Sequence, residues 1–255
     1  MADNPSFYPE KEVAPLLNFI REQLAASGRK RLVIGLSGGL DSATAAYLGT
    51  RAIGGQNLWA YMLPYATTSR DSIDDAIMVA EELGLEYDVV EITPMVDSYF
   101  NRFPIADHRR RGNFMARVRM AVLYDQSEFL NALVMGTGNR TESLLGYTTL
   151  WGDMACAFTP LGGLYKTQVR LLAAYLGVPE RIIAKPPSAD LWVGQTDEGE
   201  MGLTYEEVDR LLYCLVDLGY DDDKLVEGGF SPTLIAKVRR MMAASSFKRR
   251  LPPHP

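Results

Sequence analysis

Short apolar runs alternate with longer amphipathic stretches along the first half of the chain. Runs of branched and aromatic residues that are too short for helices predict buried strands at residues 31–36, 58–63, 86–92 and 130–135. Between these runs, apolar residues recur at helical spacing and predict helices near residues 13–24, 42–48, 69–83 and 115–129. This alternation predicts an α/β fold with a doubly wound, mostly parallel sheet that is flanked by helices. In such sheets, ligands bind beyond the carboxyl ends of the strands.

A tight turn follows the first predicted strand. Residues 35–42 read Gly-Leu-Ser-Gly-Gly-Leu-Asp-Ser, so Gly38 and Gly39 must carry the chain from strand into helix. Glycine permits positive φ angles and leaves backbone N–H groups uncovered, and such groups at a helix N-terminus attract phosphate. Asp41 would repel a phosphate unless a cation bridged the two, so its position indicates Mg²⁺. The simpler alternative is an ordinary turn in which Asp41 and Ser42 cap the helix.

A second glycine-rich turn, at residues 136–142, follows the fourth predicted strand. Because both turns follow strands of one parallel sheet, we expect them to reach the same edge of that sheet. Thr137 could then donate to a phosphate or a sugar, and Glu142 could share a metal ion with Asp41. The alternative for Glu142 is a residue of the first helical turn that the helix dipole favours.

The segment between the third and fourth predicted strands is basic. Residues 108–111 read His-Arg-Arg-Arg, and Arg117 and Arg119 follow on a predicted helix. Four apolar residues at helical spacing should form the buried side of this helix: Met115, Val118, Val122 and Phe129. The two arginines would then project from an ordered scaffold. An anionic ligand would explain them, and surface ion pairs explain them equally well.

The composition limits the kind of protein. A chain of 255 residues that is 47% hydrophobic and 23% charged fits one globular domain. Its net charge of −6 disfavours a nucleic-acid partner, because phosphate backbones require an excess of Lys and Arg. Cys156, Cys214, His108 and His254 are too scattered to predict a metal cluster, and the few cysteines fit a reducing cytoplasm. No secretion signal and no apolar window of roughly 18 residues is present, so we expect a cytoplasmic protein without a membrane partner.

Five motifs in order resemble those of the NAD synthetase family. The first, residues 35–42, resembles the SGGxDS loop of ATP pyrophosphatases, which cleave ATP between its α and β phosphates. The others are GTGNRTESLLGYTTLWGDM at 136–154, PLGGLYKTQV at 160–169, PPSADLWVGQTDEGEMGLTYEEVD at 186–209 and FKRRLPP at 247–253. The resemblance implies a Rossmann-like fold of the adenine nucleotide alpha-hydrolase type. It also implies that ATP adenylates the carboxylate of deamido-NAD and that ammonia then displaces AMP to give NAD⁺.

The resemblance also implies roles for single residues. ATP would bind to the first turn and to three later residues. The turn supplies Gly35, Leu36, Ser37, Gly38, Gly39, Leu40, Asp41 and Ser42, and the later residues are Thr137, Lys166 and Ser188. Asp41 and Glu142 would hold Mg²⁺. Asp41 and Lys166 would be catalytic, with Lys166 neutralising charge on the phosphate in the transition state. The alternative for Lys166 is a solvated lysine at a helix start.

The substrate dinucleotide would contact Arg117, Asp153 and Lys248. In this family the enzyme is usually a homodimer with the dinucleotide lying across the interface. The resemblance therefore implies ATP, deamido-NAD, ammonia and a second copy of the chain as partners.

We expect a single NAD synthetase domain over residues 1–255. Its parts would be an N-terminal helix in 1–30, an ATP-binding core in 31–183, a mobile loop in 184–200, and C-terminal helices with a tail in 201–255. The closing helices are expected at 205–218 and 232–242. The loop concentrates proline, glycine and acidic residues, which predicts closure over bound ligands. A passive connector is the alternative.

Three positions depart from the pattern of ammonia-dependent bacterial members. Where those enzymes usually carry lysine, aspartate and histidine, this chain has Leu150, Ala157 and Phe247. Several polar contacts to the substrate are thus missing, so the binding mode of the dinucleotide stays open. The segments TLWGDMA and FKRR instead resemble the synthetase domain of glutamine-dependent members. Neither cysteine lies in the Glu-Lys-Cys setting of an amidase, so we expect free ammonia as nitrogen donor, which a separate amidase could supply.

Two other classes of protein share the first loop. One is another ATP pyrophosphatase-type ligase, such as a tRNA-thiolating or GMP-forming enzyme; two isolated cysteines and the acidic charge count against a tRNA-thiolating one. The other is a non-catalytic nucleotide-binding module, which would have no need for Asp41, Glu142 and Lys166 together.

Overall fold

A parallel sheet forms the centre of this computed structural model, which describes residues 6–103, 107–188, 194 and 196–254. In this part of the chain the strands are β1 (Arg31–Gly35), β2 (Leu58–Met62), β3 (Glu86–Val89) and β4 (Ala132–Val134), in the order β3-β2-β1-β4. Successive side chains of a strand point to opposite faces. In β1, Leu32 and Ile34 accordingly belong to one apolar core and Val33 to another.

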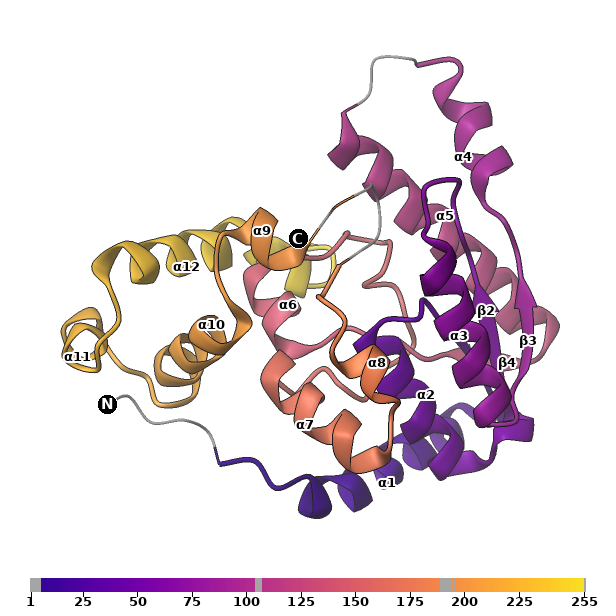
Figure 1. Cartoon of the computed structure of the whole chain (residues 1–255), viewed down its shortest axis with the longest axis horizontal. Coiled ribbons are helices and arrows are strands. Elements are labelled where there is room, and N and C mark those ends of the chain that lie inside the picture. The colour runs from indigo at the N-terminus through magenta and orange to yellow at the C-terminus, as the bar shows by residue number, and fades with distance from the viewer. Residues whose placement is uncertain (1–5, 104–106, 189–193, 195, 255) are drawn as a thin grey trace.

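Helices cover both faces of the sheet (Figure 1). The core that contains Leu32 takes residues from α1 (Pro9–Ser27), α2 (Leu40–Ile53), α3 (Arg70–Glu82), α7 (Lys166–Leu176) and α8 (Glu180–Ile183). The core that contains Val33 takes residues from α4 (Thr93–Phe100) and α5 (His108–Phe129). A short 3-10 turn, Gly55–Asn57, leads into β2. This arrangement confirms the predicted doubly wound parallel fold.

A third apolar core lies among the C-terminal helices. It takes residues from α6 (Arg140–Leu145), α9 (Asp197–Met201), α10 (Tyr205–Leu212), α11 (Asp222–Glu227) and α12 (Pro232–Ala244). A π turn, Tyr213–Asp217, extends α10, and a 3-10 turn, Ser246–Arg249, follows α12. Figure 1 shows α10, α11 and α12 to one side of the sheet. The division of residues 1–255 into the predicted parts stays a prediction.

Several predicted boundaries are wrong. β3 ends at Val89 rather than at residue 92, because Ile92 turns to begin α4, a helix that was not predicted. Phe129 was predicted to be buried and is 81% exposed; it is the last residue of α5, and Leu130 packs against the core instead. The predicted loop 184–200 includes the start of α9. Thr196 caps this helix, because its side chain accepts from the Gly199 N–H. Residues 189–193 and 195 of this loop lie outside the described residues.

No helix in the described ranges is both long enough and apolar enough to cross a membrane.

Candidate active site

The two glycine-rich turns meet at the carboxyl edge of the sheet. β1 and β4 are neighbours, with Val33 opposite Val134, so the turns that follow them lie side by side. Asn139 in the second turn donates from Nδ2 to Oδ1 of Asp41 in the first turn, at 3.2 Å. The prediction that both turns reach the same edge is therefore confirmed.

Gly38 has a backbone conformation that only glycine adopts easily. Its φ angle is +75°, and a Cβ atom at this position would lie 2.1 Å from the carbonyl oxygen of Ser72 in α3. The loop can therefore pack against α3 only because this residue has no side chain. At Gly39 φ is −95°, and the N-terminus of α2 follows directly.

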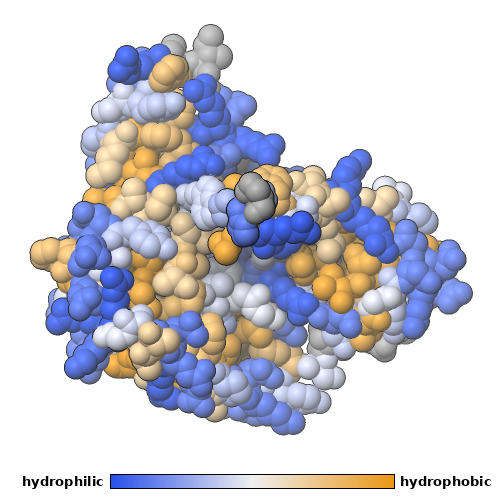
Figure 2. Space-filling model, turned by 180° about the vertical axis from the view of Figure 1, so that it is seen from behind, coloured by the Kyte–Doolittle hydropathy of each residue, from blue (hydrophilic) through white to orange (hydrophobic). Residues whose placement is uncertain are grey.

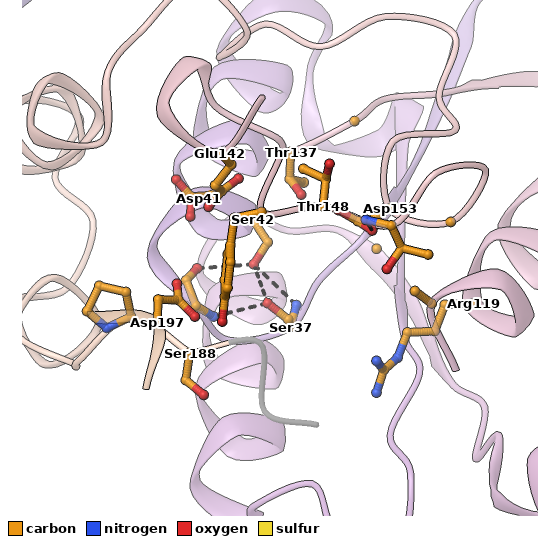
Figure 3. A pocket seen from close by; sticks show the side chains of 18 of the residues that line it. Ser37, Asp41, Ser42, Arg119, Thr137, Glu142, Thr148, Asp153, Ser188 and Asp197 are labelled. Carbon is orange, nitrogen blue, oxygen red and sulfur yellow. Dashed lines mark hydrogen bonds between the residues drawn. The ribbon is translucent and has the colours of Figure 1, made fainter. Parts of the chain in front are cut away.

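The two serines of the first turn stabilise it from within. The N–H groups of Ser37 and Gly39 donate to the hydroxyls of Ser42 and Ser37, at 3.2 and 3.3 Å, and the two hydroxyls lie 3.0 Å apart (Figure 3). We expected uncovered N–H groups here, and for Ser37 and Gly39 that expectation is wrong. An anion that binds to these N–H groups must first displace the hydroxyls, which can themselves donate to it.

Lys166 is buried between two carboxylates. Its side chain is 4% exposed, and its Nζ atom pairs with Oδ2 of Asp41 and, at 3.4 Å, with Oε1 of Glu142. Lys166 begins α7, and Asp209 holds that helix start by accepting from the Thr167 N–H at 2.8 Å. A solvated lysine at the helix start, the alternative for Lys166, is therefore wrong.

The three charges strongly perturb one another. Burial and the charge of Asp41 together raise the pKa of Glu142 to about 8. Burial acts to lower the pKa of Lys166, but the neighbouring charges of Asp41 and Glu142 outweigh it and raise that pKa above its ordinary value. Lys166 thus keeps its positive charge, and Glu142 holds a proton more tightly than an exposed glutamate does.

Asp41 and Glu142 offer oxygen ligands of the kind that Mg²⁺ prefers. Glu142 also takes part in a capping box: Oε2 accepts from the Asn139 N–H at 3.3 Å, and Asn139 Oδ1 accepts from the Glu142 N–H at 3.0 Å. The helix-start role and the metal role are therefore compatible. Among the described residues no group of three or more His, Cys, Asp or Glu side chains could hold a metal ion. A pair of carboxylates still fits Mg²⁺, because this ion usually takes its other ligands from phosphate and water.

A cavity of about 1170 Å³ opens over this cluster. Its walls include both predicted metal ligands and every predicted ATP-binding residue except Gly38, which packs against α3. Thr137 and Ser188 are on its wall but far from one another in the chain, at the end of β4 and after α8. The structure thus brings the predicted ATP residues into one space.

The predicted dinucleotide residues lie on another wall of the same cavity. Arg117 donates to the carbonyl oxygen of Leu150 at 3.1 Å, and Lys248 donates to those of Gly146 and Thr148 at 2.8 and 2.6 Å. Asp153 accepts from the Thr149 N–H at 2.7 Å. Figure 3 shows Asp153 and Arg119 on one side of the pocket and Asp41 with Glu142 on the other.

A family model described as NAD synthase matches residues 12–252. The chain belongs to this family. An NH(3)-dependent NAD(+) synthetase from Trichlorobacter lovleyi is 51% identical over 237 residues, which cover 93% of this chain and 87% of the relative.

Solved structures of similar proteins have the same fold. An NMN synthetase from Francisella tularensis superposes with a TM-score of 0.88 at 34% identity, over 98% of this chain and 99% of that chain. An NH3-dependent NAD synthetase from Campylobacter jejuni, in complex with the nitrate ion, gives a TM-score of 0.84 at 34% identity, over 98% and 100% of the two chains.

Two of the three departures from the usual pattern of NAD synthases lie in the cavity. Leu150 and Phe247 line it, on the same wall as Lys248, whereas Ala157 does not and instead donates from its backbone N–H to Val134. The wall that carries the predicted dinucleotide residues is therefore more apolar than the sequence pattern of the family leads one to expect.

Sequence reasoning missed several residues of this NAD synthase site. Asp209 accepts from Thr141 and Thr167 and so positions Lys166, and buried Asp75 pairs with Arg181 and with Lys185, which lies on the cavity wall. Asp197 lines the cavity and is 5% exposed. Asp197 and Asp209 lie within the motif at 186–209, which was the only available signal for them.

Proposed function

We infer that this chain catalyses the ATP-dependent amidation of deamido-NAD to NAD⁺ with ammonia as nitrogen donor, and releases AMP and pyrophosphate. The observation that carries this inference is the buried Lys166 between Asp41 and Glu142, next to the glycine turn that begins α2. A cation and two carboxylates at this place suit the cleavage of a triphosphate, and family membership supplies the reaction.

The reaction has two chemical steps. In the first, a carboxylate oxygen of the nicotinate attacks the α phosphorus of ATP, the bond to the β phosphate breaks, and pyrophosphate leaves. In the second, the lone pair of ammonia attacks the acyl carbon, the bond between that carbon and the AMP oxygen breaks, and AMP leaves with the electron pair. The nitrogen then releases one proton to water, which gives the neutral amide. Adenylation is needed because the oxygen of a free carboxylate is a poor leaving group.

We propose that Lys166 acts in the first step. A cation near the α phosphorus stabilises the added negative charge of the transition state more than the ground state, which raises the rate. The first turn, residues 35–42, would hold the triphosphate with the N-terminus of α2 and the serine hydroxyls. Thr137 and Ser188 would hold the rest of ATP from the cavity wall.

We propose that Asp41 and Glu142 bind Mg²⁺ together with ATP. When bound, this ion would neutralise phosphate charge as a Lewis acid. Glu142 must give up its proton to serve as a ligand, and its raised pKa of about 8 makes this a measurable event.

We propose that Arg117, Asp153 and Lys248 bind the dinucleotide. Both cations lie on the cavity wall and donate to backbone carbonyl oxygens, and an anionic substrate would replace these hydrogen bonds with ion pairs. Leu150 and Phe247 would offer apolar contact to a base or a nicotinate ring on this wall.

We propose that the chain forms a homodimer through α4 and α5. Large apolar side chains are exposed on these helices, including Met95 at 46%, Tyr99 at 39% and Phe129 at 81%. Figure 2 shows apolar surface over the lobe that these helices form. Sedimentation equilibrium is the direct measurement, and a purely monomeric protein at micromolar concentration would contradict the proposal.

We also propose a cytoplasmic location. Cys156 and Cys214 are both free thiols, and free thiols persist in a reducing compartment.

One assay separates the candidate reactions. Purified protein with ATP, Mg²⁺ and ammonium should form AMP, pyrophosphate and NAD⁺ from deamido-NAD. Nicotinic acid mononucleotide is the second acid to test, because one close structural neighbour is an NMN synthetase. A preference for the mononucleotide would make NMN synthesis the activity, and xanthosine monophosphate as the only accepted substrate would indicate a GMP-forming ligase. ATP binding without any cleavage would indicate a non-catalytic module.

A further inference from the structure

The aromatic ring of Tyr205 lies against the ammonium group of Lys166. The Nζ atom of Lys166 is over this ring, 5.3 Å from its centre, and the two side chains come from different helices, α10 and α7. Tyr205 is 1% exposed, and the side chain of Lys166 is 4% exposed. An aromatic face attracts a cation within about 6 Å of its centre, and the attraction is larger where water is excluded. The ring is thus a further partner of Lys166, beside Asp41 and Glu142.

Hydrogen bonds hold Tyr205 at both of its ends. Its hydroxyl donates to Oδ2 of Asp197 at 3.0 Å, and its backbone N–H donates to Oε1 of Glu198 at 2.9 Å. Both acceptors lie in α9, the helix that precedes α10. The ring therefore has a fixed orientation under the ammonium group.

Asp209 ties the helix that carries the ring to the helix that carries the lysine. It lies one turn after Tyr205 on α10 and is 2% exposed. Its carboxylate accepts from the hydroxyl of Thr141 in α6 at 2.5 Å and from the Thr167 N–H in α7 at 2.8 Å. The hydroxyl oxygen of Thr141 in turn accepts from the backbone N–H of Lys166 at 3.0 Å. α10 is thus joined to the start of α7, so the ring and the ammonium group keep their relative position.

The ring differs from the two carboxylates in what it leaves available. A carboxylate oxygen takes up an N–H donor of the ammonium group, whereas the face of a ring attracts the charge as a whole. Asp41 and Glu142 are also the proposed ligands of Mg²⁺, so in the loaded protein their negative charge is shared between the metal ion and Lys166. The ring of Tyr205 has no second cation to serve, and it supports the buried ammonium group while the N–H donors turn to a phosphate.

We propose that Tyr205 is a positioning residue, which holds Lys166 toward the α phosphate of ATP through the face of its aromatic ring. The inference rests on the proposed adenylation step, in which Lys166 acts. Tyr205 does not line the cavity, so its effect on the reaction passes through Lys166. The simpler account of the same ring is packing, because Tyr205 also belongs to the C-terminal apolar core.

The test weakens the face of the ring and keeps its shape. Tyr205→Phe is the reference, and phenylalanines with an increasing number of ring fluorine atoms then replace residue 205. Fluorine withdraws electron density from the ring face and is little larger than hydrogen, so packing is preserved while the attraction for a cation falls. Exchange of labelled pyrophosphate into ATP, with deamido-NAD and without ammonium, reports the first step alone. Its maximal rate should fall with each added fluorine, by about twofold to thirtyfold over the series, and the KM for deamido-NAD should stay nearly unchanged.

The same series of residues at position 220 is the matched control. The ring of Tyr220 packs against the same core and has the Nζ atom of Lys224 over it at 3.6 Å, but neither residue lines the cavity. The exchange rate should not change over this series. An equal fall in both series would mean that fluorination acts on the fold of the C-terminal core. A rate that does not depend on fluorine at position 205 would leave packing as the role of the ring. Either result overturns the proposal.

A double-mutant cycle on stability needs no activity. Fluorination at position 205 should raise the equilibrium constant of unfolding by about twofold to thirtyfold when Lys166 is present, and should change it little in Lys166→Met. Equal effects with and without the lysine would overturn the contact. The kinetic series needs no change at Lys166, so it decides the proposal even where Lys166→Met does not fold. If the wild type shows no pyrophosphate exchange, the proposed function fails and the positioning role fails with it. If exchange is present but independent of fluorine, only the positioning role fails.

Discussion

The ammonium group of Lys166 pairs with the carboxylate of Asp41, a residue 125 positions earlier in the chain. The first residue of α7 thereby reaches the first turn of α2, and Glu142 of α6 joins the pair. Two half-buried acids and one buried base thus compensate one another before any ligand binds. The same three side chains are then in place when the triphosphate and its metal arrive.

Asp41→Asn should keep the fold and impair ATP cleavage. The amide has the shape of the carboxylate but lacks the charge that binds Mg²⁺, and Glu142 remains as a partner for Lys166. We expect pyrophosphate release to fall by about 100-fold or more, with a higher requirement for Mg²⁺. Asp74→Asn, which removes an exposed carboxylate paired with Arg70, is the control. Near-normal pyrophosphate release at limiting Mg²⁺ would rule the metal role out.

Lys166→Ala should lower kcat and leave the KM for deamido-NAD nearly unchanged. The reason is that a cation near the α phosphorus acts in the transition state, where a loss of about 100-fold to 1000-fold is typical for one such group. Lys224→Ala, which removes an exposed lysine of α11, controls for general charge effects. A change in the KM for deamido-NAD alone would show that Lys166 binds the dinucleotide instead.

The stability of the free protein should fall as the pH rises from about 5 to 8. Glu142 has a pKa of about 8 in the folded chain and an ordinary value of 4.5 when exposed, so the folded state binds more protons over this range. The raised pKa of Lys166 contributes stability throughout this range, because it is lost only above the ordinary lysine value of 10.5.

Glu142→Gln should flatten this dependence. The difference in unfolding free energy between pH 5 and pH 8, from urea titrations, should shrink by at least about 1.4 kcal/mol, which corresponds to one pKa unit. The other buried acids with raised pKa values, such as Asp209, remain in both proteins and cancel in the comparison. An unchanged dependence would mean that Glu142 is ionised at neutral pH.

Gly38→Ala should destabilise the first turn, whereas Gly39→Ala should not. An alanine at position 38 must hold a φ angle of +75° and would place its Cβ 2.1 Å from a backbone oxygen of α3. At position 39, φ is −95° and the nearest atom lies 3.4 Å away. We expect a loss of about 2 kcal/mol or more for the first change, measured by chemical unfolding. Equal stability of the two variants would contradict this account of the turn.

The sequence predicted the parts of the site that local pattern determines. Residues 35–42 lie between a strand and a helix in a motif of fixed spacing, and the structure places them at the sheet edge as expected. The pairing of Lys166 with Asp41 was not visible, because it depends on how α7 packs beside α2. The hydrogen bonds of Asp209 with Thr141 and Thr167, and of Asp197 with Tyr205, were hidden for the same reason, since each joins different elements.

At the end of a helix, hydrophobic periodicity does not predict which residues are buried. Val118, Val122 and Phe129 share one face of α5, yet only the first two pack against the core. The spacing of residues defines the face, whereas the extent of the sheet decides where that face stops being covered. Phe129 is the last residue of α5 and is 81% exposed, so it lies where this cover has ended.

The last prediction concerns the nitrogen donor. A glutamine amidase with a catalytic cysteine needs a reactive thiolate. Burial raises the pKa of Cys156, which packs directly against Gly136, and Cys214 is fully buried in the C-terminal core. The chain assayed alone should therefore use ammonium chloride and turn over glutamine at no more than a background rate. Activity should rise toward alkaline pH as ammonium loses its proton, because only neutral ammonia has the attacking lone pair. Ammonia that contaminates the glutamine must first be removed enzymatically. Comparable turnover with the two donors after that treatment would show that a thiol of this chain releases ammonia from glutamine, and Cys156→Ser and Cys214→Ser would then identify which one.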